Sequence, residues 1–320
     1  MSRAGSSNSD GVLAPTTPLI VVDEFLPSDL ASEMRRDIET HFANPAEHRP
    51  ETHQVWNYWF VPGSYTYLRT APEKIIERSR VEAFHNALRD WSIAMLGMAN
   101  VTWPCLSLYV SGCRQNWHND SVNGRFGFVY SLTRDERGTI GGETLVRREH
   151  DPFRAHLATA AAGREFYQAI EPRFNRLVVF DDRLPHSVER VDGSMDPLEG
   201  RFVLHGHLSE AGTVVAGALS EDMITGPLLE LLGQIKEEVS AEGALYNGPL
   251  ILRVTIAAGG AVAACEVMVD RVIHPDPGHV EWEPLRAKLV GRFKGLRLPA
   301  AGGETVLIQP LLFGGPVGQV

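Results

Sequence analysis

The sequence is poor in cysteine and has no long apolar run. Its 320 residues include three cysteines, Cys105, Cys113 and Cys265, which are too few and too scattered for a disulfide framework or a zinc ribbon. This usage favours a reducing, cytoplasmic location. No stretch approaches the roughly 18 consecutive apolar residues of a membrane-spanning helix, and the polar residues 1–16 lack the apolar core of a signal peptide. We therefore expect a disordered leader at residues 1–16 and no membrane partner.

Basic residues are in the minority. The formal net charge is −10 at pH 7, which argues against a nucleic-acid partner. The same excess of acidic groups favours neutral or basic substrates. The hydrophobic fraction of 43% and the charged fraction of 22% are ordinary for a globular protein, and the length suggests about two domains.

The pattern of apolar residues changes along the chain. A strand is predicted at Pro18–Val22, and helices at Pro27–Phe42 and Glu73–Leu96, by the spacing of their apolar residues. Short apolar runs then predict six strands, over residues 102–110, 125–133, 141–149, 176–182, 186–191 and 201–208. Many short strands at even spacing are typical of a sandwich or jelly roll. We predict a mainly β domain with flanking helices over residues 17–212, whose helical part is residues 17–100.

The last hundred residues show a different order of elements. A helix is predicted over residues 226–243, with Pro227 near its start, and a second over residues 282–293. Residues 250–272 read as two strands joined at Gly259–Gly260, and residues 304–313 as a final strand. This order predicts a separate, small α+β domain over residues 218–320.

The segment QNWHND, residues 115–120, places His118 and Asp120 two positions apart. Residues at i and i+2 share one face of a strand, and burying an imidazole beside a carboxylate is costly without a partner. His186 follows the apolar run of residues 177–180 and supplies a third candidate. Two histidines and one carboxylate form the facial set that binds non-haem iron(II). A His-x-Asp pair alone is common by chance at a protein surface.

Two further residues point to a carboxylate-binding site near these three. Arg201 opens a predicted strand fifteen residues after His186, and its planar fork suits a carboxylate of a dicarboxylic co-substrate. Tyr109 precedes His118 by nine residues, so its phenol is expected in the same pocket. Arg190 competes with Arg201 because it lies closer to His186 in the sequence. We favour Arg201, since it follows a glycine and opens a strand.

The order of these motifs resembles the prolyl 4-hydroxylase-like branch of the iron(II)- and 2-oxoglutarate-dependent oxygenases. The matching features, in chain order, are Tyr109-x-x-Gly112, His118-x-Asp120, the GGET stretch of residues 141–144, the distal His186, and Arg201 after a glycine. The resemblance covers residues 17 to 210 and implies a double-stranded β-helix, or jelly roll. Family members often have a tyrosine three residues before the first ligand histidine, where this chain has Gln115.

By this resemblance, His118, Asp120 and His186 are the catalytic metal ligands for Fe(II), and Arg201 and Tyr109 bind 2-oxoglutarate. The implied reaction uses O2 and hydroxylates an unactivated C–H of an amino-acid side chain, free or in a peptide or protein, releasing succinate and CO2, with ascorbate as an activator. Because related halogenases replace the carboxylate with a small residue, Asp120 favours hydroxylation.

Two other functions remain open. One is a tailoring oxygenase for a small natural product, which hydroxylates, desaturates or cyclises it. The other is a non-catalytic jelly-roll docking module that holds a metal, since zinc accepts the same ligands. For an oxygenase, the expected partner is an amino-acid, peptide or small-molecule substrate.

Several residues are candidates for the substrate side. Trp117 and Arg125 flank the metal motif in the sequence. His205 shares a strand face with Arg201, which places it near the co-substrate or makes it a hydrogen-bonded histidine of the barrel wall. The aromatic segment over residues 55–70 is expected to pack helices onto the sheet, with the wall of the site as the alternative.

Residues from about 220 onward resemble, more weakly, the small C-terminal domains of TonB-like energy transducers. The similarity lies in the stretch over residues 252–269 and in the closing strand. No catalytic constellation occurs there, so we expect a module for dimerisation or partner docking.

Overall fold

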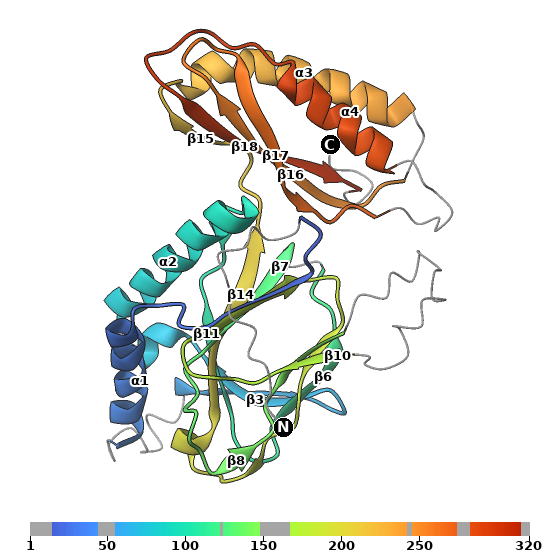
Figure 1. Cartoon of the computed structure of the whole chain (residues 1–320). Helices are drawn as coiled ribbons and strands as arrows, with labels where there is room; N and C mark the ends of the chain where they lie inside the picture. The colour runs from blue at the N-terminus through green and yellow to red at the C-terminus, as the bar shows by residue number, and fades with distance from the viewer. Residues whose placement is uncertain are drawn as a thin grey trace, which may run out of the picture.

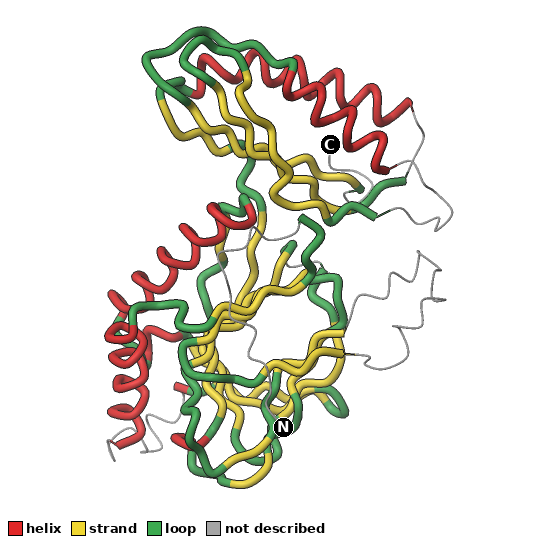
Figure 2. Tube along the Cα trace, in the orientation of Figure 1, coloured by secondary structure: helices red, strands yellow, loops and turns green. Residues whose placement is uncertain are grey.

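The larger part of the chain forms a strongly curled antiparallel sheet. The computed structural model describes residues 15–43, 55–121, 124–147, 167–241, 245–273 and 282–314. The strands of the sheet run in the order β1-β11-β7-β14-β5-β3-β6-β12-β9-β10, and they curl into a ring (Figure 2). This is the predicted jelly roll, built mainly of β-strands.

Most strands of the ring lie where the apolar runs predicted them. Their bounds are β1 (Leu19–Val22), β3 (Tyr65–Thr70), β5 (Cys105–Tyr109), β6 (Arg114–His118), β7 (Phe126–Ser131), β9 (Thr144–Arg147), β10 (Tyr167–Ile170), β11 (Arg176–Asp181), β12 (His186–Val188) and β14 (Arg201–Ser209). The short strands β4 (Asn100–Val101), β8 (Thr139–Ile140) and β13 (Asp192–Gly193) complete this part, β4 pairing with β14 and β8 with β13.

Two helices cover one side of the ring (Figure 1). Helix α1 (Ser28–Ala43) buries one face through residues three and four apart, among them Ala31, Met34 and Ile38. Helix α2 (Arg78–Leu96) does the same with an apolar stripe that includes Phe84 and Leu88. Such a stripe is what fixes a helix against a sheet. The predicted start of α2 at Glu73 was too early, since a short 3₁₀ turn occupies Pro72–Lys74.

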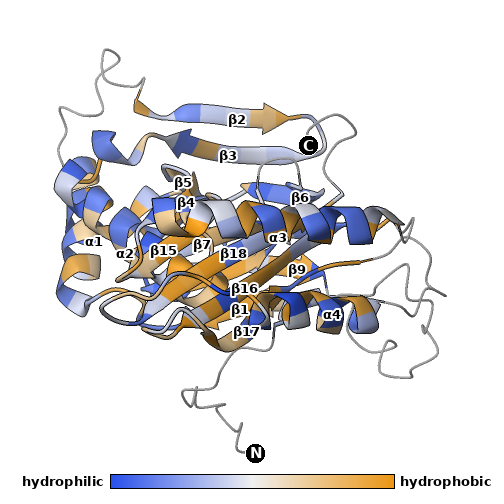
Figure 3. Ribbon diagram, turned by 90° about the horizontal axis from the view of Figure 1, so that it is seen from above, coloured by the Kyte–Doolittle hydropathy of each residue, from blue (hydrophilic) through white to orange (hydrophobic). Residues whose placement is uncertain are grey.

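The aromatic segment corrects our preferred interpretation. It forms a hairpin of β2 (Asn57–Val61) and β3, which lies at one edge of the molecule (Figure 3). Trp56 does pack on Phe42 of α1, with ring centroids 6.0 Å apart. Trp59, Tyr65 and Tyr67 instead line the cavity inside the ring. The aromatic segment therefore both packs on a helix and lines the cavity, because successive side chains along a strand point to opposite faces.

The C-terminal part forms a smaller antiparallel sheet in the order β15-β18-β16-β17. Its elements are β15 (Val214–Gly217), α3 (Glu221–Ala241), β16 (Gly248–Ile256), β17 (Val262–Asp270), α4 (Trp282–Lys294) and β18 (Thr305–Phe313). The expected α-β-β-α-β order is present, with β15 added before it. Helices α3 and α4 lie on one face of this sheet (Figure 1).

Helix α3 begins five residues before the predicted start and contains Pro227 in its interior. Ile224 and Leu228 are buried in the apolar cluster of the small sheet, as is Ile235. This burial outweighs the helix hydrogen bond that a proline cannot donate. Tertiary packing therefore allows the helix to begin before Pro227, which the sequence had placed near the helix start. No helix among the described residues is long and apolar enough to span a membrane.

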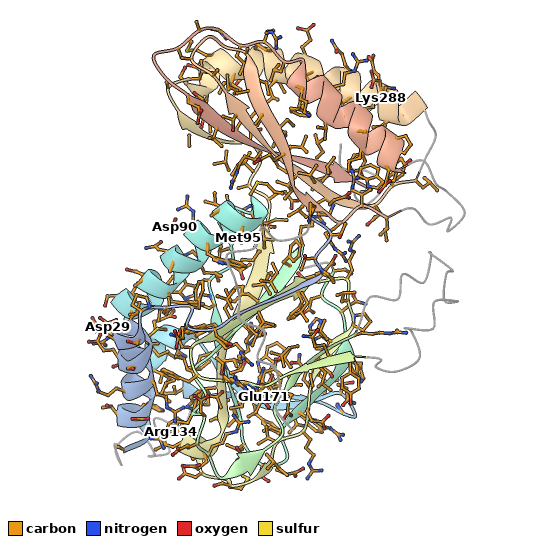
Figure 4. The ribbon with its side chains drawn as sticks, viewed as in Figure 1. Asp29, Asp90, Met95, Arg134, Glu171 and Lys288 are labelled. Carbon is orange, nitrogen blue, oxygen red and sulfur yellow. The ribbon has the colours of Figure 1, made fainter. Side chains whose placement is uncertain are left out.

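The two sheets meet through both apolar and ionic contacts. Ile251 and Ile308 of the small sheet belong to the same buried cluster as the jelly roll, close to the end of α2, where Met95 lies (Figure 4). Arg271 donates from Nε to Asp181 Oδ2, 2.9 Å away, and both side chains are almost fully buried. Its Nη1 also donates to the carbonyl oxygen of Thr16. The division into domains at residues 212–218 stays a prediction, and residues 1–14 of the expected leader lie outside the described part.

Gly97 is expected to matter for this contact. It caps α2 in the left-handed region with φ +66°, and an added Cβ would lie 2.6 Å from Ile251 Cγ2 and 2.8 Å from Ile308 Cγ2. Gly97→Ala should cost about 1–2 kcal/mol for the backbone and about 1–3 kcal/mol more for overpacking. Gly63→Ala is the matched control, because Gly63 has φ +76° and open space around it. Equal losses of unfolding free energy in urea for the two variants would contradict this prediction.

Candidate metal centre and its cavity

A cavity of about 530 Å³ lies inside the ring of strands. It is lined by residues of β2, β3, β5, β6, β7, β9, β11, β12 and β14. The lining includes Trp59, Tyr67, Arg69, Cys105, Tyr109, Gln115, His118, Asp120, Thr144, His186, Arg201, His205 and His207. A largely preformed cavity with a few converging polar groups is the usual form of a small-molecule site.

His118, Asp120 and His186 meet at one side of this cavity. His118 ends β6 and pairs directly with His186, the first residue of β12. Their ring centroids are 4.2 Å apart. Asp120 Oδ2 lies 3.9 Å from His118 Nε2 and 3.5 Å from His186 Nε2. One ligand atom from each residue lies within 4.8 Å of the others, which suits a single metal ion.

Backbone contacts orient these three side chains. The Nδ1 of His118 lies 2.7 Å from the carbonyl oxygen of Asn116, and that of His186 lies 3.0 Å from the carbonyl oxygen of Leu184. Since a carbonyl can only accept, each Nδ1 carries the proton and each Nε2 keeps a lone pair toward the cavity. The amide of Asp120 donates to the carbonyl oxygen of Asp182 at 3.0 Å. This bond holds Asp120 in place beyond the end of β6.

The local charges favour metal binding at neutral pH. Burial, and next the charge of His186, lower the pKa of His118 below its usual value. The neighbouring His186 imidazole lowers the pKa of Asp120, although burial opposes this. At neutral pH His118 is therefore neutral and Asp120 is ionised. These are the protonation states that bind a cation.

Arg201 provides a second feature of the cavity. Its side chain is buried, with 2% of its surface exposed, and its Nη2 donates to Thr144 Oγ1 at 3.0 Å. Its Nε and Nη1 have no hydrogen-bond partner within the described part of the chain. Burial lowers the pKa of this guanidinium. Unpaired buried donors on a charged group are costly, so they indicate a missing acceptor such as a carboxylate.

Tyr109 lies beside Arg201 on the paired strand, in register with it. The Arg201 guanidinium carbon is 4.8 Å from the centroid of the Tyr109 ring. Burial raises the pKa of Tyr109 above its usual value, so the phenol keeps its proton. Its hydroxyl donates to Gln115 Oε1 at 3.2 Å. The competing Arg190 is half exposed and pairs with Asp192 at the surface.

The remaining predicted residues divide between the cavity and the surface. His205 lines the cavity and shares a hydrogen bond of 2.8 Å with Ser107 Oγ. Burial, followed by the charges of Arg69 and Arg201, lowers its pKa to about 3. The structure does not bring Trp117 or Arg125 to this cavity. Trp117 is 47% exposed, and Arg125 pairs with Glu210 on the outside.

Three further residues line the cavity that were not among the predicted site residues: Gln115, Thr144 and Arg69. Gln115 Nε2 is 3.1 Å from His118 Nε2, so this amide bridges Tyr109 and the metal centre. Thr144 belongs to the GGET stretch, and the place of this stretch in the order of motifs could have indicated that Thr144 lies near the site. No sequence motif indicated Arg69, because its position depends on the hairpin of β2 and β3.

A second group of ligand atoms adjoins the first. Asp120, Asp182 and His207 also bring one ligand atom each within 4.8 Å of one another. His207 Nδ1 is 3.0 Å from Asp182 Oδ2, which accounts for this group as a histidine–carboxylate pair. The first group fits iron(II) better, since both imidazole Nε2 atoms and Asp120 face the cavity that Arg201 also lines.

One family model and several solved structures are similar to this chain. Residues 105–208 match the model of a family described as the 2OG-Fe(II) oxygenase superfamily. Solved structures of similar fold include a prolyl hydroxylase from Trichoplax adhaerens, in complex with a peptide fragment of hypoxia inducible factor (15% identity, TM-score 0.43, covering 59% of this chain and 81% of that one). They also include a prolyl-4-hydroxylase from Pseudomonas putida (16% identity, TM-score 0.43, covering 60% of this chain and 92% of that one). A third is a non-haem α-ketoglutarate-dependent epimerase of nogalamycin biosynthesis (14% identity, TM-score 0.41, covering 61% of this chain and 79% of that one).

A search of curated proteins finds no match to this sequence. The family match covers all five residues of the predicted metal and co-substrate site: Tyr109, His118, Asp120, His186 and Arg201. It does not extend to the C-terminal part, whose similarity to TonB-like domains stays a prediction.

Proposed function

We propose that this protein, a 2-oxoglutarate-dependent non-haem iron dioxygenase with a 2OG-Fe(II) oxygenase domain, hydroxylates an unactivated C–H of an amino-acid side chain, free or in a peptide, and releases succinate and CO2. One observation carries the proposal. The cavity combines a two-histidine, one-carboxylate group with a buried arginine whose Nε and Nη1 have no partner among the described residues. The histidine and carboxylate group suits a metal ion, and the arginine suits a carboxylate of a dicarboxylic acid bound beside it.

In this proposal His118, Asp120 and His186 hold the iron. Fe(II), 2-oxoglutarate and O2 supply the oxidising chemistry when they are bound. The protein contributes ligand atoms that are already oriented by the carbonyl oxygens of Asn116 and Leu184. Such orientation lowers the cost of assembling the site.

Arg201 then binds the distal carboxylate of 2-oxoglutarate. Its two unpaired donors supply the fork that a carboxylate accepts, and Thr144 holds the guanidinium through Nη2. Tyr109 packs on the guanidinium and keeps water from its face. Gln115 accepts from Tyr109, so its amide nitrogen is directed toward the metal centre.

Succinate release from 2-oxoglutarate tests the cofactor chemistry. Wild-type protein with iron(II), oxygen and ascorbate should release succinate slowly without any other substrate. Under anaerobic conditions the protein should show the absorption band of an iron–2-oxoglutarate complex. The absence of both in folded protein would contradict the proposal and favour a metal-binding module that is not an enzyme.

Mass spectrometry of incubated amino acids, peptides and small molecules then tests the reaction. A gain of one oxygen supports hydroxylation. A loss of two hydrogens would instead indicate a desaturating or cyclising oxygenase. That the C-terminal part serves dimerisation or partner docking stays a proposal, and its test is the oligomeric state of the full chain measured by light scattering across a range of concentrations.

A further inference from the structure

Arg69 is a second guanidinium in the same cavity, and the proposed function leaves it without a role. It lies on β3 in register with Ser107 of β5, which in turn pairs with Val203 of β14. Arg201 and Tyr109 form the neighbouring inward-facing row, two residues along the same strands. Two residues of a strand span about 6–7 Å. The two arginines therefore face one cavity from successive rows.

A stack of aromatic rings fixes both arginines. The Arg69 guanidinium carbon lies 5.0 Å from the centroid of the Trp59 ring. Trp59 stacks on Tyr67 with centroids 6.3 Å apart, and Tyr67 on Tyr109 with centroids 5.0 Å apart. Arg201 lies over the far ring of this stack. The two cations are thus packed on different rings of one stack, Arg69 on Trp59 and Arg201 on Tyr109.

The contacts of Arg69 leave its charge uncompensated. Its Nη2 contacts Cys105 Sγ, and a cysteine sulfur is a weak acceptor. Within the described ranges, no carboxylate forms an ion pair with Arg69, and Asp120 is the only acidic residue that lines the cavity. A partly buried arginine with an aromatic face and no anion is suited to bind one.

The charges in the cavity, with iron(II) and 2-oxoglutarate bound, also indicate that Arg69 binds an anion. Iron(II) and the two carboxylates of 2-oxoglutarate cancel each other, and Asp120 cancels Arg201. His205 is neutral because its pKa lies far below 7, and His207 is paired with Asp182. Only the positive charge of Arg69 is left, so this partly buried guanidinium favours an anionic ligand.

The geometry points to Arg69 as the anchor for a carboxylate of the substrate that is oxidised. This inference rests on the proposed function and narrows its substrate class to amino acids or peptides that present a free α-carboxylate to the cavity. Because Arg69 lies in a different row from Arg201, each arginine is available to bind its own carboxylate. The net charge of −10 predicted neutral or basic substrates, but the charges that line the cavity decide recognition at short range.

Binding measurements test this inference without turnover. Calorimetry on protein loaded with manganese(II) and 2-oxoglutarate, without oxygen, would use N-acetyl amino acids and their C-terminal amides as matched pairs. Acetyl-aspartate amide and acetyl-glutamate amide would be included to detect recognition of an acidic side chain instead. We expect at least one acid to bind and its amide to bind about 10- to 100-fold more weakly, since a hydrogen-bonded ion pair is lost.

Three variants complete the test. Arg69→Gln should lose the preference for acids, and Arg69→Lys should restore part of it. Arg190→Gln is the matched control, because this arginine pairs with Asp192 at the surface, and it should behave as wild type. In Arg190→Gln the succinate released without another substrate and the KM for 2-oxoglutarate should stay near the wild-type values.

Each result has a definite meaning. The inference is overturned if no acid binds, if acids and amides bind alike, or if only the acidic-side-chain amides bind. It is also overturned if Arg69→Gln raises the KM for 2-oxoglutarate, since Arg69 would then bind the co-substrate. Failure of the proposed function would look different, because the wild type would release no succinate.

Discussion

Replacing His186 with alanine should abolish succinate release. The change removes one of the three proposed metal ligands, and His186 Nε2 also lies 3.5 Å from Asp120 Oδ2. Loss of a residue that only supports a metal ligand lowers metal affinity about 10- to 100-fold, so loss of a ligand itself should lower turnover by more than about 100-fold. The measurement is succinate formed from 2-oxoglutarate, together with bound iron determined by metal analysis.

Thermal unfolding separates a lost ligand from a lost fold. Manganese(II) should raise the Tm of the wild type, because a ligand that binds only the folded state stabilises it, and should leave the Tm of His186→Ala unchanged. His207→Ala is the matched control, since His207 pairs with Asp182, and it should keep its metal. If His186→Ala retained metal and His207→Ala lost it, the Asp120–Asp182–His207 group would be the metal site instead.

Replacing Arg201 with alanine should weaken 2-oxoglutarate binding strongly. Arg201 is 2% exposed and offers two donors that lack partners in the described structure. Removing one side of a buried, hydrogen-bonded charge pair costs about 2–5 kcal/mol. The KM for 2-oxoglutarate should therefore rise at least about 30-fold, and high co-substrate concentrations should restore most of the turnover.

Two further variants make this prediction specific. Arg201→Lys should recover only part of the affinity, because an ammonium group cannot form the bidentate contact. Arg190→Ala removes the arginine that competed with Arg201 in the sequence, and it should leave the KM unchanged, since its partner is Asp192. A large effect of Arg190→Ala with none of Arg201→Ala would show that the co-substrate carboxylate lies elsewhere.

The sequence by itself predicted the jelly roll and the three residues that meet at one side of its cavity. Strand periodicity acts locally, so short apolar runs located most of the strands, and the order of His118, Asp120 and His186 matched a known family. Helix ends were less certain. The burial of Ile224 and Leu228 extends α3 past Pro227, and local sequence carries no information about such distant contacts.

Only the tertiary structure decided which polar residues share the cavity. The preceding glycine favoured Arg201 over Arg190, but it is the pairing of β14 with β5 that sets Arg201 beside Tyr109, while Arg190 lies at the surface. Pairing of β3 with β5 and β6 likewise brings Arg69 and Gln115 into the site and turns Trp59 toward it. The physical reason is that strand alternation specifies which residues share a face, but long-range pairing specifies what that face meets.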